Sequence, residues 1–367
     1  MRILPVVGWT ATLAVIIVGA FEVTVRAYDW AQYGVPITAP ETLLSDLVVM
    51  DSLGMHARPG ARYRQFRINS IGARGAEQVL DTSPPAVVVI ASGASETFGL
   101  YEKPNGEWPR QLEDSMRVRC GAGVQVVNAA FAGMSLPTVQ QDVRLRLSRL
   151  GAQALIYYPT PMQYLYPLLP DAAKPTTDGP PPIDPWRSRA LPRLRDAAKR
   201  SIPEPVLNQL RILDTKRSQR QAGAGARNEA PTDRLDAYER DLRSLVGEIR
   251  HGRMTPILML HRNRFKDTLA IEEQRRLRAW ERFYPLYTAR AIIEFDAVAA
   301  ERTTQVARDS LVPVVDPLPT LRALEADPFA DFSHFNDLGS AVVGGVAATA
   351  IAPVLCAGRA AVTPVKK

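Results

Sequence analysis

Two segments far apart in the sequence carry side chains that could together perform nucleophilic catalysis. Ser95 follows an apolar run, among the small residues of 92–99 (SGASETFG), and Asp331 and His334 stand three residues apart near the C-terminus. Serine is a poor nucleophile until a base takes its proton, and histidine titrates in the right range to do so. A nearby carboxylate would fix the imidazole tautomer. Taken alone, Ser95 could equally cap a helix after a glycine-rich turn, and His334 could be an ordinary surface residue.

An ester hydrolysed by such a serine also needs hydrogen-bond donors for the developing oxyanion. The N–H of Ser95 is one candidate, and that of Gly133, in the segment 128–135 (NAAFAGMS) after a second apolar run, is another. Gln163 could supply a side-chain amide and Thr160 a hydroxyl from a third segment. The alternative for Gly133 is a plain turn glycine.

The remaining histidines and the cysteines are less informative. His261 is the only rival base, but it lacks a neighbouring carboxylate in the sequence. Cys120 and Cys356 could form one disulfide in an oxidising compartment, or could be two separate buried thiols. Two cysteines exclude a disulfide-rich scaffold and a cysteine-based zinc cluster.

Five short apolar runs predict the strands that position these residues. They are continuous rather than alternating, as is typical of strands covered on both faces. The predicted strands are 86–91, 124–128, 154–158, 256–260 and 311–315, and helical patterns cover 108–116, 135–150, 233–250, 271 to about 309, and 339–356. This alternation predicts a parallel sheet with helices on both faces.

The N-terminus predicts a membrane anchor. Residues 3–21 carry no charge, and about 20 apolar residues suffice for a helix to cross a bilayer. Arg2 precedes the run, which favours a cytoplasmic N-terminus and an outward-facing remainder. Val18-Gly19-Ala20 also resembles a cleavage site, so a secreted protein after removal of a signal peptide is the alternative.

Residues 166–231 interrupt the alternation with a proline- and arginine-rich segment, which predicts an insertion rather than a sheet element. It could be a lid or a basic surface for an anionic polymer or lipid headgroups, but a solvated, partly helical excursion is the favoured interpretation. Its end, residues 221–230, is predicted to be flexible.

The composition of the whole chain excludes two classes of protein. With 46% apolar residues, the sequence argues against a disordered chain. The net charge of +7 is spread along the sequence, which argues against a nucleic-acid partner.

Together, these motifs resemble the SGNH (GDSL-like) hydrolase family, in its membrane-anchored, envelope-facing form. The first motif is Gly93-Ala94-Ser95, the second-motif glycine is Gly133, and the last motif is Asp331-Phe-Ser-His334. Residues 69–75 (NSIGARG) resemble a segment that often precedes the first strand in anchored relatives. The chain departs from the family at Ala94, where aspartate is usual, and after the third strand, where the oxyanion-binding asparagine is missing.

The resemblance implies a flavodoxin-like three-layer α/β/α fold with a five-stranded parallel sheet, Ser95 as nucleophile, His334 as base and Asp331 orienting it. The expected organisation is an anchor or signal peptide (1–25), an N-terminal extension (26–80), a catalytic domain (81–165 and 232–358), the insertion (166–231) and a flexible tail (359–367).

These expectations predict a serine esterase that removes acyl groups, above all O-acetyl groups, from an envelope or exported polysaccharide. No metal or organic cofactor is needed for this chemistry. A sugar hydroxyl replacing water would turn the same site into an O-acetyltransferase. A non-catalytic polysaccharide-binding protein is a further alternative, favoured by the missing asparagine, and a membrane-tethered interaction protein using the insertion is a weaker one. The sequence leaves the oligomeric state open.

Overall fold

The computed structural model describes residues 4–81, 86–177, 182–221, 225–265, 273, 277 and 280–357. Its centre is a five-stranded parallel sheet with the strand order β6-β5-β7-β8-β9. The strands are β5 (Val87–Gly93), β6 (Val124–Asn128), β7 (Ala154–Tyr158), β8 (Thr255–Met259) and β9 (Val314–Val315). This order is the flavodoxin-like one, with a switch point beside β5 where ligands bind beyond the strand ends. The predicted fold class and all five strands are confirmed; β9 is shorter than predicted because Leu311 has a φ of 53° and Pro313 offers no N–H to a ladder.

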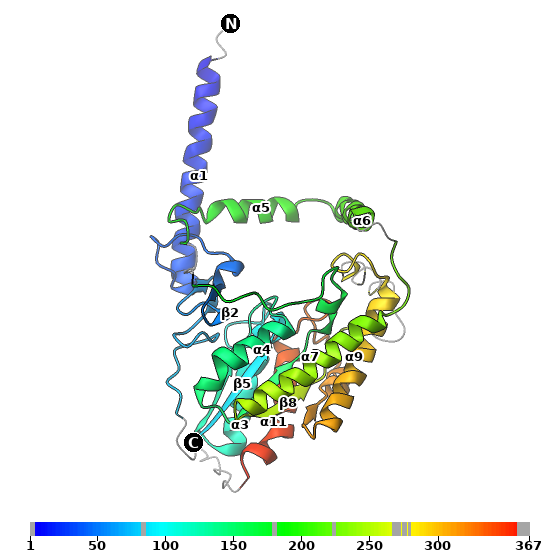
Figure 1. The fold of residues 1–367 in the computed structure, drawn as a ribbon. Helices are drawn as coiled ribbons and strands as arrows, with labels where there is room; N and C mark the ends of the chain where they lie inside the picture. The colour runs from blue at the N-terminus through cyan, green and yellow to red at the C-terminus, as the bar shows by residue number, and fades with distance from the viewer. Residues whose placement is uncertain are drawn as a thin grey trace.

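Helices cover both faces of the sheet, which gives three layers (Figure 1). One face is covered by α3 (Trp108–Cys120) and α11 (Asp337–Leu355), and the other by α4 (Leu136–Leu145), α7 (Thr232–His251) and α9 (Ala289–Asp309). In β5, Val87 and Val89 pack with Trp108 on the first face, whereas Val88 and Ile90 join the core on the second. A strand buried on both faces has no polar alternation, which is why its apolar run is continuous.

The helix boundaries differ from the predicted ones in two places. The pattern over 135–150 is divided into α4, capped by Ser135, and the short η2 (Leu147–Leu150). The pattern from 271 to about 309 is interrupted rather than continuous. Residues 273, 277, 280 and 281 are helical, but Pro285 lies in a turn and the Thr288 side chain caps a new helix, α9. Residues 271–272, 274–276 and 278–279 of that prediction lie outside the described residues. A further helix, α10 (Leu318–Arg322), follows β9.

The N-terminal part consists of the helix α1 (Leu4–Tyr33) and two small antiparallel hairpins. The hairpins are formed by β1 (Val48–Asp51) with β2 (Gly54–Ala57), and by β3 (Arg62–Tyr63) with β4 (Phe66–Arg67); η1 (Leu44–Leu47) precedes them. Half of α1 projects from the rest of the molecule (Figure 1). Ile3 of the predicted anchor, and several side chains of its apolar run, lie outside the described residues.

Within the described residues, the one helix long and apolar enough to span a bilayer is α11. Val343, Ala347 and Ile351 of α11 are fully buried against α3, so its apolar composition serves the core. A disulfide between Cys120 and Cys356 joins the ends of these two helices, with 5.7 Å between the Cα atoms. Of the two alternatives for the cysteines, the structure has the bridge.

The insertion contains no sheet strand among its described residues. The short η3 (Pro161–Leu165) comes just before the insertion. The insertion itself contains the helices α5 (Ala190–Arg200) and α6 (Glu204–Gln221). Its end is more ordered than predicted, because Arg227 exchanges backbone hydrogen bonds with Leu286 and Thr288. Residues 222–224 of this end, and all of the predicted tail 359–367, lie outside the described residues.

Candidate active site

A sharp turn after β5 presents Ser95 at the carboxyl edge of the sheet. Gly93 has a φ of 158°, and a Cβ there would lie 2.6 Å from the carbonyl oxygen of Tyr158. Only glycine allows the chain to turn so close to β7. Ser95 opens the short helix α2 (Ser95–Phe98), and the first backbone N–H groups of a helix have no intrahelical partner.

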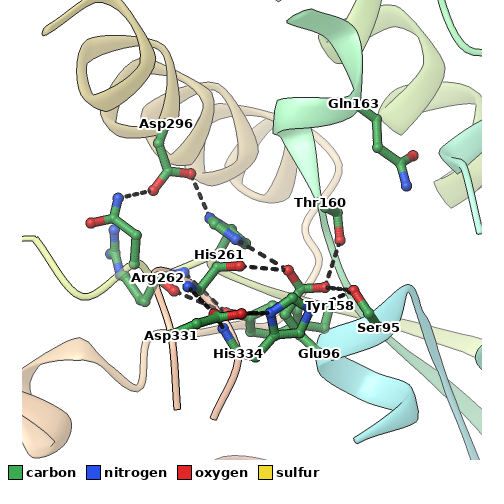
Figure 2. Close-up of polar contacts among 12 residues, drawn as sticks. Ser95, Glu96, Tyr158, Thr160, Gln163, His261, Arg262, Asp296, Asp331 and His334 are labelled. Atoms are coloured by element: carbon green, nitrogen blue, oxygen red, sulfur yellow. Dashed lines mark hydrogen bonds and ion pairs between the residues drawn. The ribbon is translucent and has the colours of Figure 1, made fainter. Parts of the chain in front are cut away.

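Ser95, His334 and Asp331 form a continuous hydrogen-bonded chain (Figure 2). The Ser95 Oγ lies 2.8 Å from the His334 Nε2, and the His334 Nδ1 lies 2.8 Å from the Asp331 Oδ2. The Asp331 Oδ1 also accepts from the backbone N–H groups of Ser333 and His334, which orients the carboxylate. The geometry is that of a nucleophile, a general base and an orienting acid.

The electrostatics keep the acid ionised and make the imidazole more basic. Burial favours neutral Asp331, but hydrogen bonds from His334 and Ser333 hold the pKa of Asp331 below its usual range. Burial disfavours charged His334, yet its hydrogen bond to Asp331 and the charges of Glu96 and Glu102 raise its pKa above the ordinary value. The site therefore stabilises the imidazolium that forms when His334 takes the serine proton.

A second carboxylate, Glu96, lies buried beside the nucleophile. Its Oε2 is 3.3 Å from the Ser95 Oγ and accepts from the Thr160 hydroxyl at 3.2 Å, while its Oε1 accepts from the Ser333 hydroxyl at 3.1 Å. Burial opposes its ionisation, but His261 and His334 lower the pKa of Glu96 to about 2. Glu96 is therefore an anion at neutral pH.

His261 continues this second chain, contrary to the expectation that it lacks a neighbouring carboxylate. Its Nδ1 lies 2.5 Å from the Asp296 Oδ1, and its Nε2 lies 3.9 Å from the Glu96 Oε1 (Figure 2). Asn263 donates to the other oxygen of Asp296. Burial disfavours the charged imidazole, but Asp296 and Glu96 raise the pKa of His261 to about 9. At neutral pH the buried His261 is thus a cation that stands between Asp296 and the Glu96 anion.

The predicted oxyanion donors differ in how the structure places them. Gly133, with a φ of 84°, is exposed and has open space where a Cβ would stand. Gln163 lies apart from Ser95 (Figure 2), and its amide donates to the carbonyl oxygen of Met134 at 3.0 Å. Thr160 donates to Glu96, so both third-segment side chains are engaged with groups other than the serine.

Aromatic rings flank the imidazole on the open side of the site. The Tyr101 ring lies 5.2 Å and the Phe332 ring 6.1 Å from the His334 ring. Tyr101 is 56% exposed, so one edge of the site offers a substrate an aromatic surface. Burial of its hydroxyl beside Asp331 raises the pKa of Tyr101 to about 12.

Sequence reasoning singled out Ser95, His334 and Asp331, which the structure brings together, but it missed Glu96, Asp296 and Ser333. Asp296 stands among the apolar positions of the helical pattern in α9, and a buried acid on an apolar helix face is the one signal that could have indicated a buried partner. Within the described residues, no group of three or more His, Cys, Asp or Glu side chains is arranged to hold a metal ion.

No family model matches the chain, and no curated protein matches it. Solved structures similar to it include an acetylxylan esterase from Geobacillus stearothermophilus, with 14% identity and a TM-score of 0.40 over 76% of this chain and 96% of that one. A lipase/acylhydrolase from Enterococcus faecalis shares 12% identity, with a TM-score of 0.40 over 72% and 95% of the two chains. A protein assigned to the lipolytic G-D-S-L family, from Desulfitobacterium hafniense DCB-2, has 12% identity and a TM-score of 0.40 over 72% and 99%.

These neighbours are esterases and lipolytic hydrolases. At such low similarity, the function of this chain has to be argued from its own residues.

Proposed function

We propose that this protein is a serine ester hydrolase of the SGNH type. The observation that carries the proposal is the hydrogen-bonded chain from the Ser95 Oγ through His334 to Asp331, with 2.8 Å at each link. A binding protein has no physical need for a hydroxyl, an imidazole and a carboxylate in this alignment.

The reaction follows from that geometry. The Ser95 Oγ attacks the ester carbonyl carbon while the His334 Nε2 takes its proton, and the N–H groups of Ser95 and Gly133 are assigned to the oxyanion. The tetrahedral intermediate collapses to an acyl-enzyme, and the imidazolium returns the proton to the departing alkoxide. Water, deprotonated by His334, then attacks the acyl-enzyme, releases the carboxylic acid and regenerates Ser95.

The proposed substrate is an acylated, above all O-acetylated, polysaccharide of the cell envelope or of an exported polymer. The exposed Tyr101 ring beside His334 supports a sugar, because aromatic walls pack against the apolar faces of ligands. The proposed location is a single-pass membrane protein anchored by residues 3–21, with the catalytic domain outside the cytoplasm. The disulfide supports an oxidising compartment for that domain.

Two alternatives have specific support. A sugar hydroxyl that replaces water gives an O-acetyltransferase through the same acyl-enzyme. A non-catalytic polysaccharide-binding protein is favoured by the engaged amide of Gln163 and the lack of an asparagine after β7. Losing one oxyanion donor costs on the order of 100- to 1000-fold in rate, so such a site would turn over slowly or not at all.

Labelling with a fluorophosphonate tests the nucleophile without knowledge of the substrate. We expect the full chain to be labelled, and the Ser95→Ala and His334→Gln variants to stay unlabelled. His251→Gln, at the exposed end of α7, is the matched control and should label as wild type does. A folded wild-type chain that takes up no probe would favour the binding protein.

Assays with acyl esters and acetylated glycans then distinguish hydrolysis from acetyl transfer. A hydrolase releases acetate at the same rate with and without added sugar, whereas a transferase gives acetylated acceptor and less free acetate.

A further inference from the structure

One helix of the insertion, α5, is fixed to α1 at the point where the apolar run of α1 ends. The carboxylate of Glu22, the residue directly after that run, accepts from the Ser188 hydroxyl at 2.6 Å and from the backbone N–H groups of Arg189 and Ala190 at 3.0 and 2.7 Å. A side chain of α1 thus caps the N-terminus of α5. Figure 1 shows α5 beginning beside α1 and running away from it to one side, at the level between the projecting half of α1 and the body of the protein.

The rotation of α5 about its own axis is fixed by charges on the side that faces the protein. Arg193 forms an ion pair with Asp29 of α1 at 2.5 Å, and the buried Arg189 lies 3.5 Å from the same carboxylate. Arg189 also donates to the carbonyl oxygens of Pro36 and Ala39. Farther along, Asp196 lies 3.9 Å from Arg64 of the loop between β3 and β4. These contacts hold one face of α5 against the body.

The opposite face of α5 is apolar and exposed. Leu191 and Leu194 are 60% and 41% exposed, and Trp186, just before the helix, is 89% exposed. At 100° per residue, Leu191, Leu194 and Ala198 share one side, and Arg189, Arg193 and Asp196 the other. Because the charged side faces the body, the apolar side faces the projecting half of α1.

Basic residues flank this apolar face. Arg195 has a side chain that is 69% exposed and stands next to Leu191 on the helix circumference, at one edge of the apolar face, and Lys199 is exposed farther round from the same edge. Long basic side chains beside an apolar stripe place their stems on hydrocarbon and their charges at headgroups.

We propose that α5 lies in the headgroup region of the bilayer that α1 crosses, with its apolar face on the acyl chains and its basic residues on anionic lipid phosphates. The inference rests on the anchor of the proposed function. It goes further, because two fixed points, α1 and α5, would set the orientation of the catalytic body relative to the membrane. Lipid acyl chains offer Leu191 and Leu194 far more apolar surface to bury against than a hydrated polysaccharide does, which favours lipid as the partner.

Fluorescence from single positions tests the inference on the full chain. The native cysteines are paired, so a new cysteine at Leu194 can be labelled with the environment-sensitive dye NBD under non-reducing conditions. In vesicles containing phosphatidylglycerol, we expect the dye at Leu194→Cys to shift to the blue and to be quenched severalfold by lipids carrying spin labels on their acyl chains. Val118→Cys, on the exposed face of α3 and 76% exposed, is the matched control and should show neither effect.

Extraction with carbonate distinguishes the possible failures. If the chain stays in the vesicles but the dye gives the same signal at positions 118 and 194, the placement of α5 is wrong and the anchor is not. A chain released by carbonate contradicts the anchor and the inference together. A response at position 194 to soluble polygalacturonate, but not to lipid, would assign this face to a polymer and also overturn the inference.

Discussion

At the residue scale, the imidazole of His334 stands among several acidic groups. Asp331 contacts its Nδ1, the buried Glu96 lies beside the serine that contacts its Nε2, and Glu102 contributes from a greater distance. The hydroxyl of Tyr101 faces the same region and stays neutral at ordinary pH. Two negative charges near one imidazole stabilise its protonated form, so Glu96 is a positioning residue that acts through His334.

Replacing Glu96 by glutamine should therefore change the pH profile of the enzyme. The rate requires neutral His334, so it rises with pH through the raised pKa of that residue. In Glu96→Gln, the loss of the buried negative charge lowers this pKa and moves the rise to lower pH. The maximal rate should fall by about tenfold, the effect of about 1.4 kcal/mol on the barrier, because the imidazolium is less stabilised. The measurement is kcat/KM for an acyl ester across the pH range.

Two companion variants make this result specific. Glu96→Asp keeps the negative charge, so its kcat/KM should rise at the same pH as that of the wild type. Glu301→Gln, exposed on α9, should leave the pH profile unchanged. An unaltered profile in Glu96→Gln would show that the carboxylate has only a packing role. A faster enzyme would show instead that Glu96 competes with His334 for the serine proton.

The meeting of Ser95, His334 and Asp331 was predictable from sequence, whereas the buried chain of Glu96, His261 and Asp296 beside them was not. Ser95, Gly133 and the Asp331–His334 pair each follow a recognisable strand end or precede a helix, and the order of the motifs indicates a common site. His261 is 35 residues from Asp296 and 165 residues from Glu96 in the sequence, and the three meet only in the folded chain. No local spacing encodes such contacts, because they depend on how α9 packs beside the end of β8.

At the element scale, the contact between His261 and Asp296 ties the end of β8 to α9 and should make stability depend on pH. The native pKa of His261, about 9, lies above its ordinary value of 6.5. The native state keeps this proton while the unfolded state loses it, so the stabilisation is complete below pH 6.5 and is lost as the pH rises to about 9. At about 1.4 kcal/mol per unit, the loss is on the order of 3 kcal/mol. The midpoint temperature of thermal unfolding of the wild-type chain should therefore fall over this pH interval. The midpoint of His261→Gln should fall much less.

A second prediction at this scale concerns the disulfide. Cys120 and Cys356 close a loop over a sequence separation of 236 residues and join α3 to α11, the two helices of one layer. Replacing both by serine should lower the free energy of unfolding by about 2–5 kcal/mol in urea denaturation. Fluorophosphonate labelling of Ser95 at 25 °C should persist. If dithiothreitol leaves the wild-type unfolding midpoint unchanged, the bridge is absent in the isolated protein.

Most elements were predictable because burial leaves a clear periodicity. The five strands are apolar without interruption, and α7 buries Leu235, Leu242 and Ile249 at helical spacing. The helix predicted from 271 to about 309 is interrupted, because its apolar spacing continues through an aromatic turn at Pro285, where Tyr284 packs on Trp280. Side chains in such a turn are as apolar as those of a helix, so periodicity does not distinguish the two.

At the scale of the whole molecule, α1 is divided into two functional parts. The residues before Glu22 project from the body, and among them Trp9, Val15 and Ile16 are at least 60% exposed. The residues from Glu22 belong to the folded protein, since Val25 and Asp29 are each only 4% exposed. Where α1 changes from one role to the other, it holds α5 in place.

Two truncations should separate these roles. A chain lacking residues 1–21 keeps Glu22 and Asp29, so its insertion should stay docked and its Ser95 should label at the wild-type rate. A chain lacking residues 1–33 should also label, but it leaves the buried Arg189 without its carboxylates. Without Glu22 and Asp29, α5 loses the cap of its N-terminus and the acidic partners of Arg189 and Arg193, so it should separate from the body. Limited trypsin digestion should then cleave the insertion of the shorter chain at least tenfold faster. Equal digestion of the two chains would mean that α5 is held by contacts other than those with α1.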